Sequence, residues 1–319
     1  MTCAADFISY DPKPGPGQGK HIVFLTGDEE YRSEEGLPML AKILSQRHGF
    51  QCTVLFPLTD GIINPENQAS LPHADALDSA DAIVMLLRYR NWPEAEMKPF
   101  ADAVGRGVPI VALRTSTHAF NYPTSASTEL RSFNKCGKDV LGEGWVNHWG
   151  NHKKEATRGV IEPQGKSHPI LNGVDDVFGD TDVYEAYPAA DAAILMRGQV
   201  LAGMKPTDPP ASYQKKRATD GQEQDINDPM MPVAWTRMNK NETGKINRVF
   251  CTTMGAATDL QSEGLRRMVV NAVFWGLELH VPDKADVAFV DAYHPSAYGF
   301  GGYRRGIKPE DHVLGRVLK

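Results

Sequence analysis

Short apolar runs alternating with helix-like patterns are the feature that most constrains how this chain can fold. The runs cover residues 21–25, 51–56, 81–87 and 108–113. Helical apolar spacing follows the first and third runs, from Ser33, which could cap a helix, to Gly49 and again over 93–104. Nearly continuous apolar strands are typical of a parallel sheet covered by helices on both faces. The sequence therefore predicts an α/β fold.

The rest of the chain adds to this domain. Further strands are expected at 192–200, 231–237 and 247–253, and a closing helix at 263–279. We expect an extended lead-in over 1–20, one α/β domain over 21–280 with a surface insertion at about 205–228, and a Gly/Tyr-rich tail over 281–319. The tail is too rich in glycine to form a core, so we expect it to wrap the body or a partner, which could be a second copy.

Composition narrows the classes of molecule that could be partners of this chain. The chain has 34 basic and 40 acidic residues among 319, a formal charge of -6, which argues against a nucleic-acid surface. No window approaches the ~20 apolar residues of a membrane span. The cysteines form no CxxC pair, so no zinc knuckle is indicated. No charged and apolar leader is visible, yet Cys3-Ala4-Ala5-Asp6 resembles the end of a signal peptide, which favours export to the periplasm over a cytoplasmic location.

Three of the predicted strands end in unusually polar loops, at residues 27–32, 88–92 and 114–118. Ligands of open parallel sheets bind beyond the carboxyl ends of the strands. Opposed guanidinium and carboxylate groups there suit a polyhydroxy or anionic small molecule. The alternative is that these charges only pair with one another. The predicted binding residues in the three loops are Asp28, Tyr31, Arg32, Arg88, Arg90, Thr115 and Ser116.

The turn after the fourth strand has the position of a nucleophile elbow. Ser116 is the serine candidate there, but no glycine flanks it, so we expect it to bind a ligand oxygen rather than attack. A glutaminase would need a cysteine at this turn, and Cys136 could serve only by folding back into it. The long polar and aromatic segment 119–158 that follows is expected to form a lid.

Histidines are the next candidates. On a helix, His148, His152 and Glu155 would share one face and could hold Zn²⁺ or a similar divalent ion, with the two histidines as the first ligands. Gly150 lies between the histidines, and no HExxH pattern is present. Acid–base catalysis is the alternative role, because histidine titrates near neutrality.

Four segments of the chain occur in a fixed order: Val111-Ala-Leu-Arg-Thr-Ser-Thr-His118, Lys166-Ser-His-Pro-Ile-Leu-Asn-Gly173, Gly179-Asp-Thr-Asp-Val-Tyr-Glu185 and Arg248-Val-Phe-Cys-Thr-Thr-Met-Gly255. Together they resemble the ThuA-like (trehalose utilisation) family, which belongs to the class I glutamine amidotransferase-like superfamily. The resemblance spans roughly residues 20–280 and implies a flavodoxin-like three-layer sandwich with a mostly parallel sheet and no glutaminase cysteine. It also implies a role in sugar catabolism, with keto-glycosides as substrates.

This chain departs from the family pattern at two positions. Ala256 follows Gly255 where a histidine is usual, and Arg114 stands at the elbow where histidine is common. If those histidines serve the family's chemistry, this chain must use other groups or has changed its reaction.

The main hypothesis is an enzyme that removes a proton next to the carbonyl of a keto-sugar or keto-glycoside, as an isomerase or lyase does. His118, His148 or Glu29 could be the base, and Arg114, Arg88 or a metal ion could stabilise the enolate. Tyr31, Tyr184 and Trp145 would contact the sugar, and Asp182 would orient a partner. The alternatives are a non-catalytic carbohydrate-binding protein that stacks Trp92, Trp145 and Trp149 on sugars, and a serine hydrolase that uses Ser116.

Overall fold

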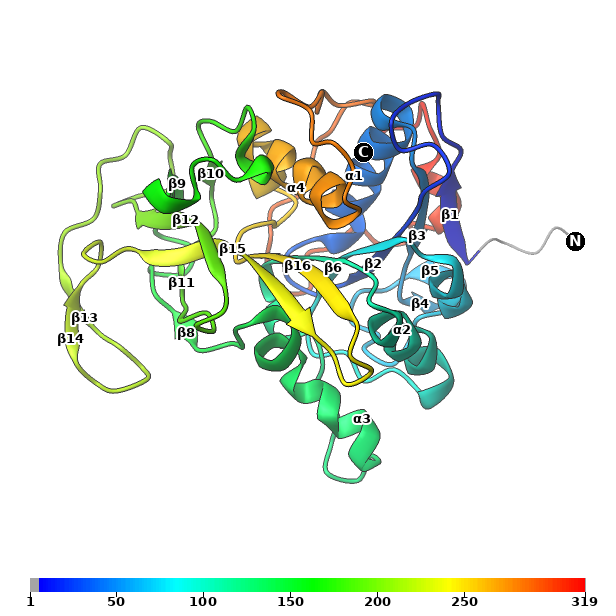
Figure 1. Ribbon diagram of the computed structural model, residues 1–319, viewed down its shortest axis with the longest axis horizontal. Helices are drawn as coiled ribbons and strands as arrows, with labels where there is room; N and C mark the ends of the chain where they lie inside the picture. Colours follow the sequence, from blue (N-terminus) through cyan, green and yellow to red (C-terminus); the bar gives the residue numbers. More distant parts are fainter. Residues whose placement is uncertain (1–5, 319) are drawn as a thin grey trace, which may run out of the picture.

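The computed structural model describes residues 6–318, and a ten-stranded sheet with helices on both faces forms its centre (Figure 1). Neighbouring strands follow the order β1-β3-β2-β6-β7-β16-β15-β12-β9-β10. The segment Cys3-Ala4-Ala5 that favoured export lies outside the described residues. In chain order the ten strands are β1 (Phe7–Tyr10), β2 (His21–Gly27), β3 (Gln51–Leu55), β6 (Ala82–Leu87), β7 (Ile110–Leu113), β9 (Thr157–Ile161), β10 (Phe178–Gly179), β12 (Ala193–Val200), β15 (Met231–Lys240) and β16 (Ile246–Thr252).

One half of the sheet is parallel. Strands β3, β2, β6, β7 and β16 pair in parallel, in the flavodoxin-like order 2-1-3-4-5. Helices α1 (Ser33–His48) and α4 (Glu263–Gly276) cover one face, and α2 (Glu94–Arg106) covers the other. The predicted α/β fold with helices on both faces is confirmed.

The other half is antiparallel. Strands β16, β15, β12, β9 and β10 pair antiparallel in that order, and β1 adds antiparallel to β3 at the opposite edge. The sheet is therefore mixed and only partly parallel. The half that contains β9, β10 and β12 extends away from the helices α1 and α2 in Figure 1.

Short elements surround the sheet. The hairpin β13 (Gln214–Lys216) and β14 (Glu223–Asp225) occupies the predicted insertion, and β8 (Asn147–His148) pairs with β11 (Tyr184–Glu185). A small hairpin joins β4 (Leu58–Thr59) and β5 (Ile62–Ile63), and α3 (Thr128–Ser132) lies in the predicted lid. Within the described residues, we find no helix that is long and apolar enough to span a membrane.

The start of α1 differs from the prediction. Arg32, not Ser33, precedes the helix, and it has a left-handed backbone with φ 59°. The Ser33 hydroxyl instead accepts hydrogen bonds from the backbone N–H groups of Gly27 (3.0 Å) and Asp28 (3.1 Å). The prediction of a Ser33 cap is therefore wrong, because the hydroxyl fixes the loop after β2 rather than the helix end.

The C-terminal tail wraps its own chain. The Tyr10 hydroxyl of β1 donates to the His312 carbonyl (2.7 Å), and Lys42 of α1 pairs with Asp291 (2.6 Å). In Figure 1 the last segment, in red, lies beside β1. The tail therefore packs on the body of its own chain. An oligomer formed through the tail stays a prediction.

Candidate functional site

The three polar strand ends meet at one edge of the parallel half, beside the strand where the order reverses. Glu29, after β2, pairs with Arg88 and with Arg90 (2.7 Å), both after β6. Arg90 is fully buried. Gly27 lets the Arg90 side chain pass close to the end of β2, since a Cβ at this position would lie 2.9 Å from the Arg90 Cδ. The charges at this rim therefore largely satisfy one another, which was the alternative reading of these loops.

Asp28 also has a structural environment. It is fully buried and accepts the backbone N–H groups of Glu30 (2.7 Å) and Tyr31 (2.5 Å), and the Thr115 hydroxyl. Thr115 is buried with it. These two predicted ligand contacts are thus occupied within the protein, because both side chains are used to join the loop after β2 to the turn after β7.

The elbow after β7 is occupied by Arg114, not by Ser116. Arg114 has a φ of 45°, the left-handed conformation that strains a residue at a sharp strand-to-helix turn. Ser116 lies deeper, fully buried, where its hydroxyl donates to the Met85 carbonyl (3.0 Å) and accepts from the Leu87 N–H (3.2 Å). The Ser116 predictions, as nucleophile or ligand donor, are wrong because this hydroxyl faces the sheet.

Cys136 does not replace the missing nucleophile. Its thiol is buried, and burial, with a smaller effect of Asp139, raises its pKa to about 12. A thiolate is the nucleophilic form of cysteine, and it would be rare here at neutral pH.

Arg114 serves Asp182 instead of a ligand. Its guanidinium pairs with the Asp182 carboxylate (2.9 Å) and donates to the carbonyls of Asp182 and Thr253, at 2.7 Å each. The rings of Tyr31 and Tyr184 lie against its Cζ at 4.7 and 3.8 Å. Arg114 has no exposed surface, so the prediction that it touches an enolate is wrong. It holds the Asp182 carboxylate in place from the buried side.

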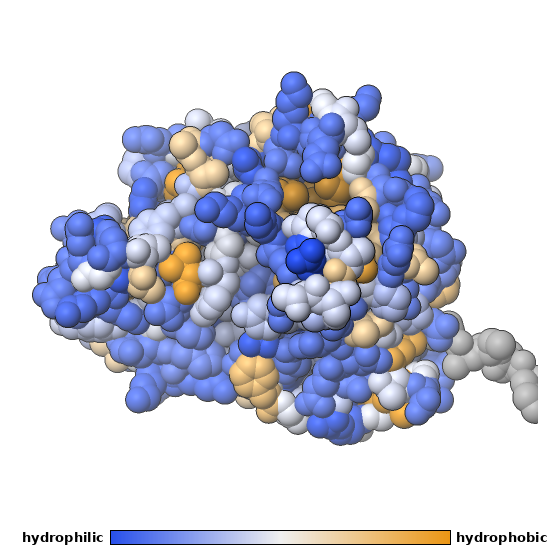
Figure 2. Space-filling model, turned by 90° about the horizontal axis from the view of Figure 1, so that it is seen from below, coloured by the Kyte–Doolittle hydropathy of each residue, from blue (hydrophilic) through white to orange (hydrophobic). Residues whose placement is uncertain are grey.

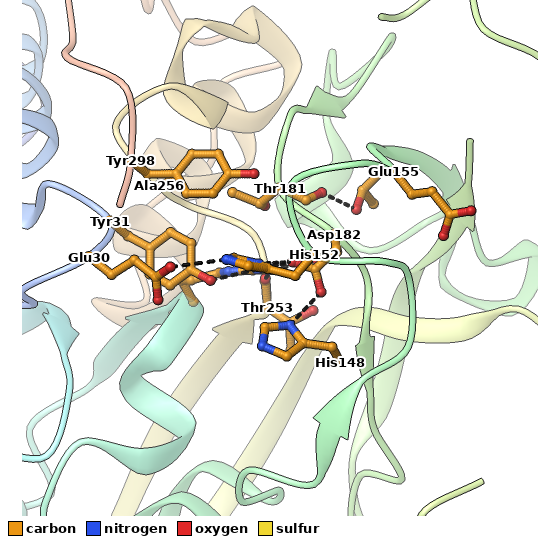
Figure 3. Close-up of polar contacts among 12 residues, drawn as sticks. Glu30, Tyr31, His148, His152, Glu155, Thr181, Asp182, Thr253, Ala256 and Tyr298 are labelled. Carbon is orange, nitrogen blue, oxygen red and sulfur yellow. Dashed lines mark hydrogen bonds and ion pairs between the residues drawn. The ribbon is translucent and has the colours of Figure 1, made fainter. Parts of the chain in front are cut away.

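Two histidines share the Asp182 carboxylate (Figure 3). The His148 Nδ1 lies 2.7 Å from one oxygen and the His152 Nδ1 lies 2.9 Å from the other. The His152 Nε2 also lies 3.0 Å from Glu30. Burial acts to raise the pKa of Asp182, but Arg114 and the hydrogen bonds from both histidines hold it well below its usual range. Asp182 is therefore a stable anion that orients its partners.

The two histidines differ in whether a ring nitrogen remains without a hydrogen-bond partner among the described residues. Hydrogen bonds to Asp182 and Glu30 raise the pKa of His152 to about 9, so its ring is a cation with both nitrogens engaged. The His148 side chain is 35% exposed, and among the described residues its Nε2 has no hydrogen-bond partner. A histidine held by a carboxylate at Nδ1 presents Nε2 as a base or acid.

The same group could hold a metal ion. Ligand atoms of His148, His152 and Asp182 all lie within 4.8 Å of one another. A metal ion would have to compete at this group with protons and with Arg114, because metal ligands must be deprotonated and Arg114 already neutralises the Asp182 carboxylate.

The expected helix through the histidines is not formed. His148 lies on β8 opposite Tyr184 of β11, and His152 follows in a turn. Glu155 points away from the pair (Figure 3) and accepts hydrogen bonds from the Asn151 N–H and the Tyr213 hydroxyl, at 2.7 Å each. Glu155 is therefore no third ligand.

Aromatic rings border His148. The Trp145 ring, which is half-buried, lies 4.9 Å from the His148 ring and 5.1 Å from the His118 ring between centroids. Burial and the nearby charges of Arg88 and Arg114 lower the pKa of His118 to about 3, so His118 is neutral and a weak base. Trp92 and Trp149 are fully buried, and their predicted stacking on a sugar is wrong.

The tail closes the opposite side of the site. Tyr298 stacks on Tyr31 at 5.4 Å and lies 5.8 Å from the His152 ring. The Gly299 N–H donates to the Glu30 carbonyl (2.8 Å), and its carbonyl accepts from the buried guanidinium of Arg32 (2.6 Å). Arg32 and Tyr31, both predicted to bind a ligand, thus hold the tail in place.

Sequence reasoning missed Glu30 and Tyr298 as parts of this site. Glu30 lies inside the polar loop after β2, so its place beside two predicted residues was an available signal. Tyr298 had no such signal, because 116 positions separate it from Asp182 and nothing in the tail pattern indicates where it returns to the body.

Comparisons with known proteins agree with the resemblance noted in the sequence. The sequence model of the family described as "ThuA: Trehalose utilisation" matches residues 21–276. No curated protein matches.

Solved structures of low identity are also similar. A ThuA-like protein from Bacteroides uniformis is 15% identical, with 83% of this chain and 94% of that chain covered and a TM-score of 0.47. A second ThuA-like protein, from Parabacteroides merdae, is 14% identical, with 81% of this chain and 90% of that chain covered and a TM-score of 0.47. PurLQS from Thermotoga maritima is 10% identical, with 81% of this chain and 98% of that chain covered and a TM-score of 0.40. Since the family match covers most of the residues, the chain belongs to the ThuA (trehalose utilisation) family.

Proposed function

We propose that this protein is an enzyme of sugar catabolism that removes a proton next to the carbonyl of a keto-glycoside, with His148 as the base. The observation that carries the proposal is the hydrogen bond of 2.7 Å between the His148 Nδ1 and Asp182, which leaves Nε2 free at the surface of the site. Asp182 holds the ring in one tautomer and stabilises its charged form after proton transfer.

The reaction proceeds in two steps. The His148 Nε2 takes the proton from the carbon next to the carbonyl, and the electron pair of that C–H bond moves to the carbonyl oxygen as an enolate. In the second step, an isomer forms when the proton of the neighbouring hydroxyl moves to the enolate oxygen and the abstracted proton returns to the former carbonyl carbon. Elimination occurs instead when the glycosidic C–O bond breaks, its electron pair leaves with the glycosidic oxygen, and that oxygen takes the proton from His148. A nucleophile is not required, which fits an elbow occupied by Arg114.

Arg88 is the best candidate to stabilise the enolate. Its side chain is 20% exposed, and one of its terminal nitrogens pairs with Glu29. Among the described residues, its Nε and second terminal nitrogen have no hydrogen-bond partner, so they could donate to an oxyanion. Burial acts to lower its pKa, but Glu29 and Asp28 raise it above the ordinary value, so the charge is permanent.

Solvent exchange provides the direct test. In D₂O, the wild-type protein should replace the proton next to the carbonyl of a 3-keto-glucoside with deuterium, as followed by proton NMR. His148→Gln should slow the exchange by roughly 10²- to 10⁴-fold, the usual contribution of a general base. His280→Gln is the matched control, because His280 is exposed and lines a surface pocket with Pro169 and Trp275 that includes none of the site residues.

Two results would count against the proposal. Exchange at the wild-type rate in His148→Gln would remove His148 as the base. Saturable binding of keto-glycosides with no exchange in the wild-type protein would favour the non-catalytic carbohydrate-binding alternative.

A further inference from the structure

A groove lies beside Trp145, among residues that precede β8 and residues that follow β11. Its volume is about 690 Å³, within the range of small-molecule sites. The side chains that line it include Lys138, Glu143, Trp145, Tyr187, Thr219 and Arg237. We call it the Tyr187 groove.

Trp145 connects this groove to the catalytic histidine. It lines the groove, and its ring centroid lies 4.9 Å from that of His148 and 4.5 Å from that of Tyr184. Trp145 is thus the side chain that the His148 site and the Tyr187 groove share, so a molecule that extends from His148 past Trp145 could enter the groove.

The walls of the groove are fixed by one buried carboxylate. Glu185, which is 1% exposed, accepts from the Tyr187 hydroxyl (2.9 Å) and from the Ala218 N–H (2.9 Å). The Tyr187 N–H in turn donates to Glu143 (2.6 Å). Ala218 belongs to the turn of the β13–β14 hairpin, so the insertion in the sequence supplies one wall. A wall that is ordered before binding costs little entropy when a ligand arrives.

Tyr187 keeps its ring available despite these hydrogen bonds. The residue is 40% exposed, which places it among the exposed large hydrophobic residues of the described part of the chain. An aromatic face beside a cation such as Lys138 suits a ring with an apolar face and polar edges. A pyranose ring has this character. Arg237 and Thr219 also line the groove, where they already donate to Asp191, to the Asp139 carbonyl and to Glu185.

We propose that the Tyr187 groove is a binding subsite for the second ring of a two-ring glycoside, whose oxidised ring lies at His148. The inference rests on the proposed function for the position of the first ring. It assigns a role to the inserted hairpin, and it predicts that the enzyme prefers keto-disaccharides to keto-sugars with a small aglycone.

Substrate size tests the proposal. Removing the ring with Tyr187→Ala should raise KM about tenfold for a keto-disaccharide, a change of about 1.4 kcal/mol. The KM for the keto methyl glucoside should change far less, and kcat for both should stay similar, since the lost contact acts on binding. Tyr187→Phe keeps the ring and should keep the ratio of the two KM values. Ile246→Ala is the surface control, because Ile246 is 43% exposed and does not line the groove.

A second variant fills the groove instead of widening it. A Cβ on Gly144 would have the Thr117 carbonyl oxygen as its nearest neighbour at 4.0 Å, so a side chain fits without a backbone clash. Because Gly144 lines the groove, Gly144→Leu should weaken the keto-disaccharide more than the keto methyl glucoside. Equal effects on both substrates in both variants, or no effect on either, would overturn the inference.

Binding without turnover separates this inference from the proposed function. Saturation-transfer NMR with the unoxidised disaccharides trehalose, maltose and cellobiose should detect contact that Tyr187→Ala removes and His148→Gln retains. If proton exchange fails but this contact is found, the groove stands and the reaction does not. If exchange is confirmed and none of the three disaccharides depends on Tyr187, the groove is not a sugar subsite.

Discussion

At the scale of single residues, the first turn of α1 contains an unusual carboxyl group. Glu34 is buried, and neither of its carboxyl oxygens has a hydrogen-bond partner among the described residues. Burial, with added effects of Glu35 and Asp28, raises its pKa to about 8. Glu34 is therefore mostly protonated at neutral pH, and the folded state resists its ionisation.

The pH dependence of stability follows from this shift. Below the ordinary value of 4.5 both states hold the proton, and between 4.5 and about 8 only the folded state keeps it, so stability falls as pH rises. Glu34→Gln lacks this loss. Its Tm, measured by thermal unfolding, should exceed that of the wild type at pH 8 by on the order of 5 °C and show little gain at pH 4. An equal gain at both pH values would contradict the assignment.

At the scale of elements, the tail segment that carries Tyr298 and Gly299 acts as a strap across the loop after β2. It is held by ring stacking and by hydrogen bonds to Glu30 and Arg32 rather than by a strand or helix. Such segments open locally at a lower free energy than the sheet beneath them.

Removing the stacked ring should loosen the strap. Tyr298→Ala should increase hydrogen exchange at residues 293–304 by up to about tenfold, because an aromatic pair contributes about 0.5–1.5 kcal/mol. Exchange mass spectrometry on the intact protein measures this directly. Phe300→Ala is the control, since Phe300 is 60% exposed, and exchange that rises equally in both variants would count against the stacking.

The elements themselves show what the sequence could and could not predict. Uniform apolar runs such as 81–87 identify strands, and polar residues at their ends identify the site edge. Strand direction was harder, since β15 and β16 have the same composition whichever way they pair. The five-residue connection 241–245, with Gly244 at φ 82°, is a hairpin signal and could have revealed the antiparallel half.

The proposed pair of His148 and Asp182 was only half predictable. His148 and Asp182 were both candidates, but their contact depends on the pairing of β8 with β11, two strands of two residues each. Elements that short have no periodicity to detect. The long separation of 34 positions between the two residues gave no local clue either.

At the scale of the whole molecule, the Arg114–Asp182 pair joins the two halves of the sheet. Arg114 follows β7 of the parallel half, and Asp182 lies between β10 and β11 beside the antiparallel half. Both side chains have no exposed surface. The site is therefore built at the junction, where one buried charge pair fixes both sides.

Breaking this pair should be costly. Arg114→Met leaves a buried carboxylate without its main partner and should lower the free energy of unfolding by about 3–5 kcal/mol, as measured by urea titration. Arg114→Met combined with Asp182→Leu should recover part of the loss. Arg237→Met is the comparison, because its partner Asp191 is 56% exposed and the loss there should be below about 1 kcal/mol. A similar loss in both single variants would refute the role of the junction.

The strap also sets the order in which the protein becomes functional during synthesis. The sheet, the elbow and the histidines are all encoded before residue 277, whereas Tyr298 and Gly299 leave the ribosome later. Domains fold largely in the order of translation. A nascent chain can thus bring His148 and Asp182 together early, while the wall beside Glu30 and His152 forms only after Tyr298 and Gly299 have been made.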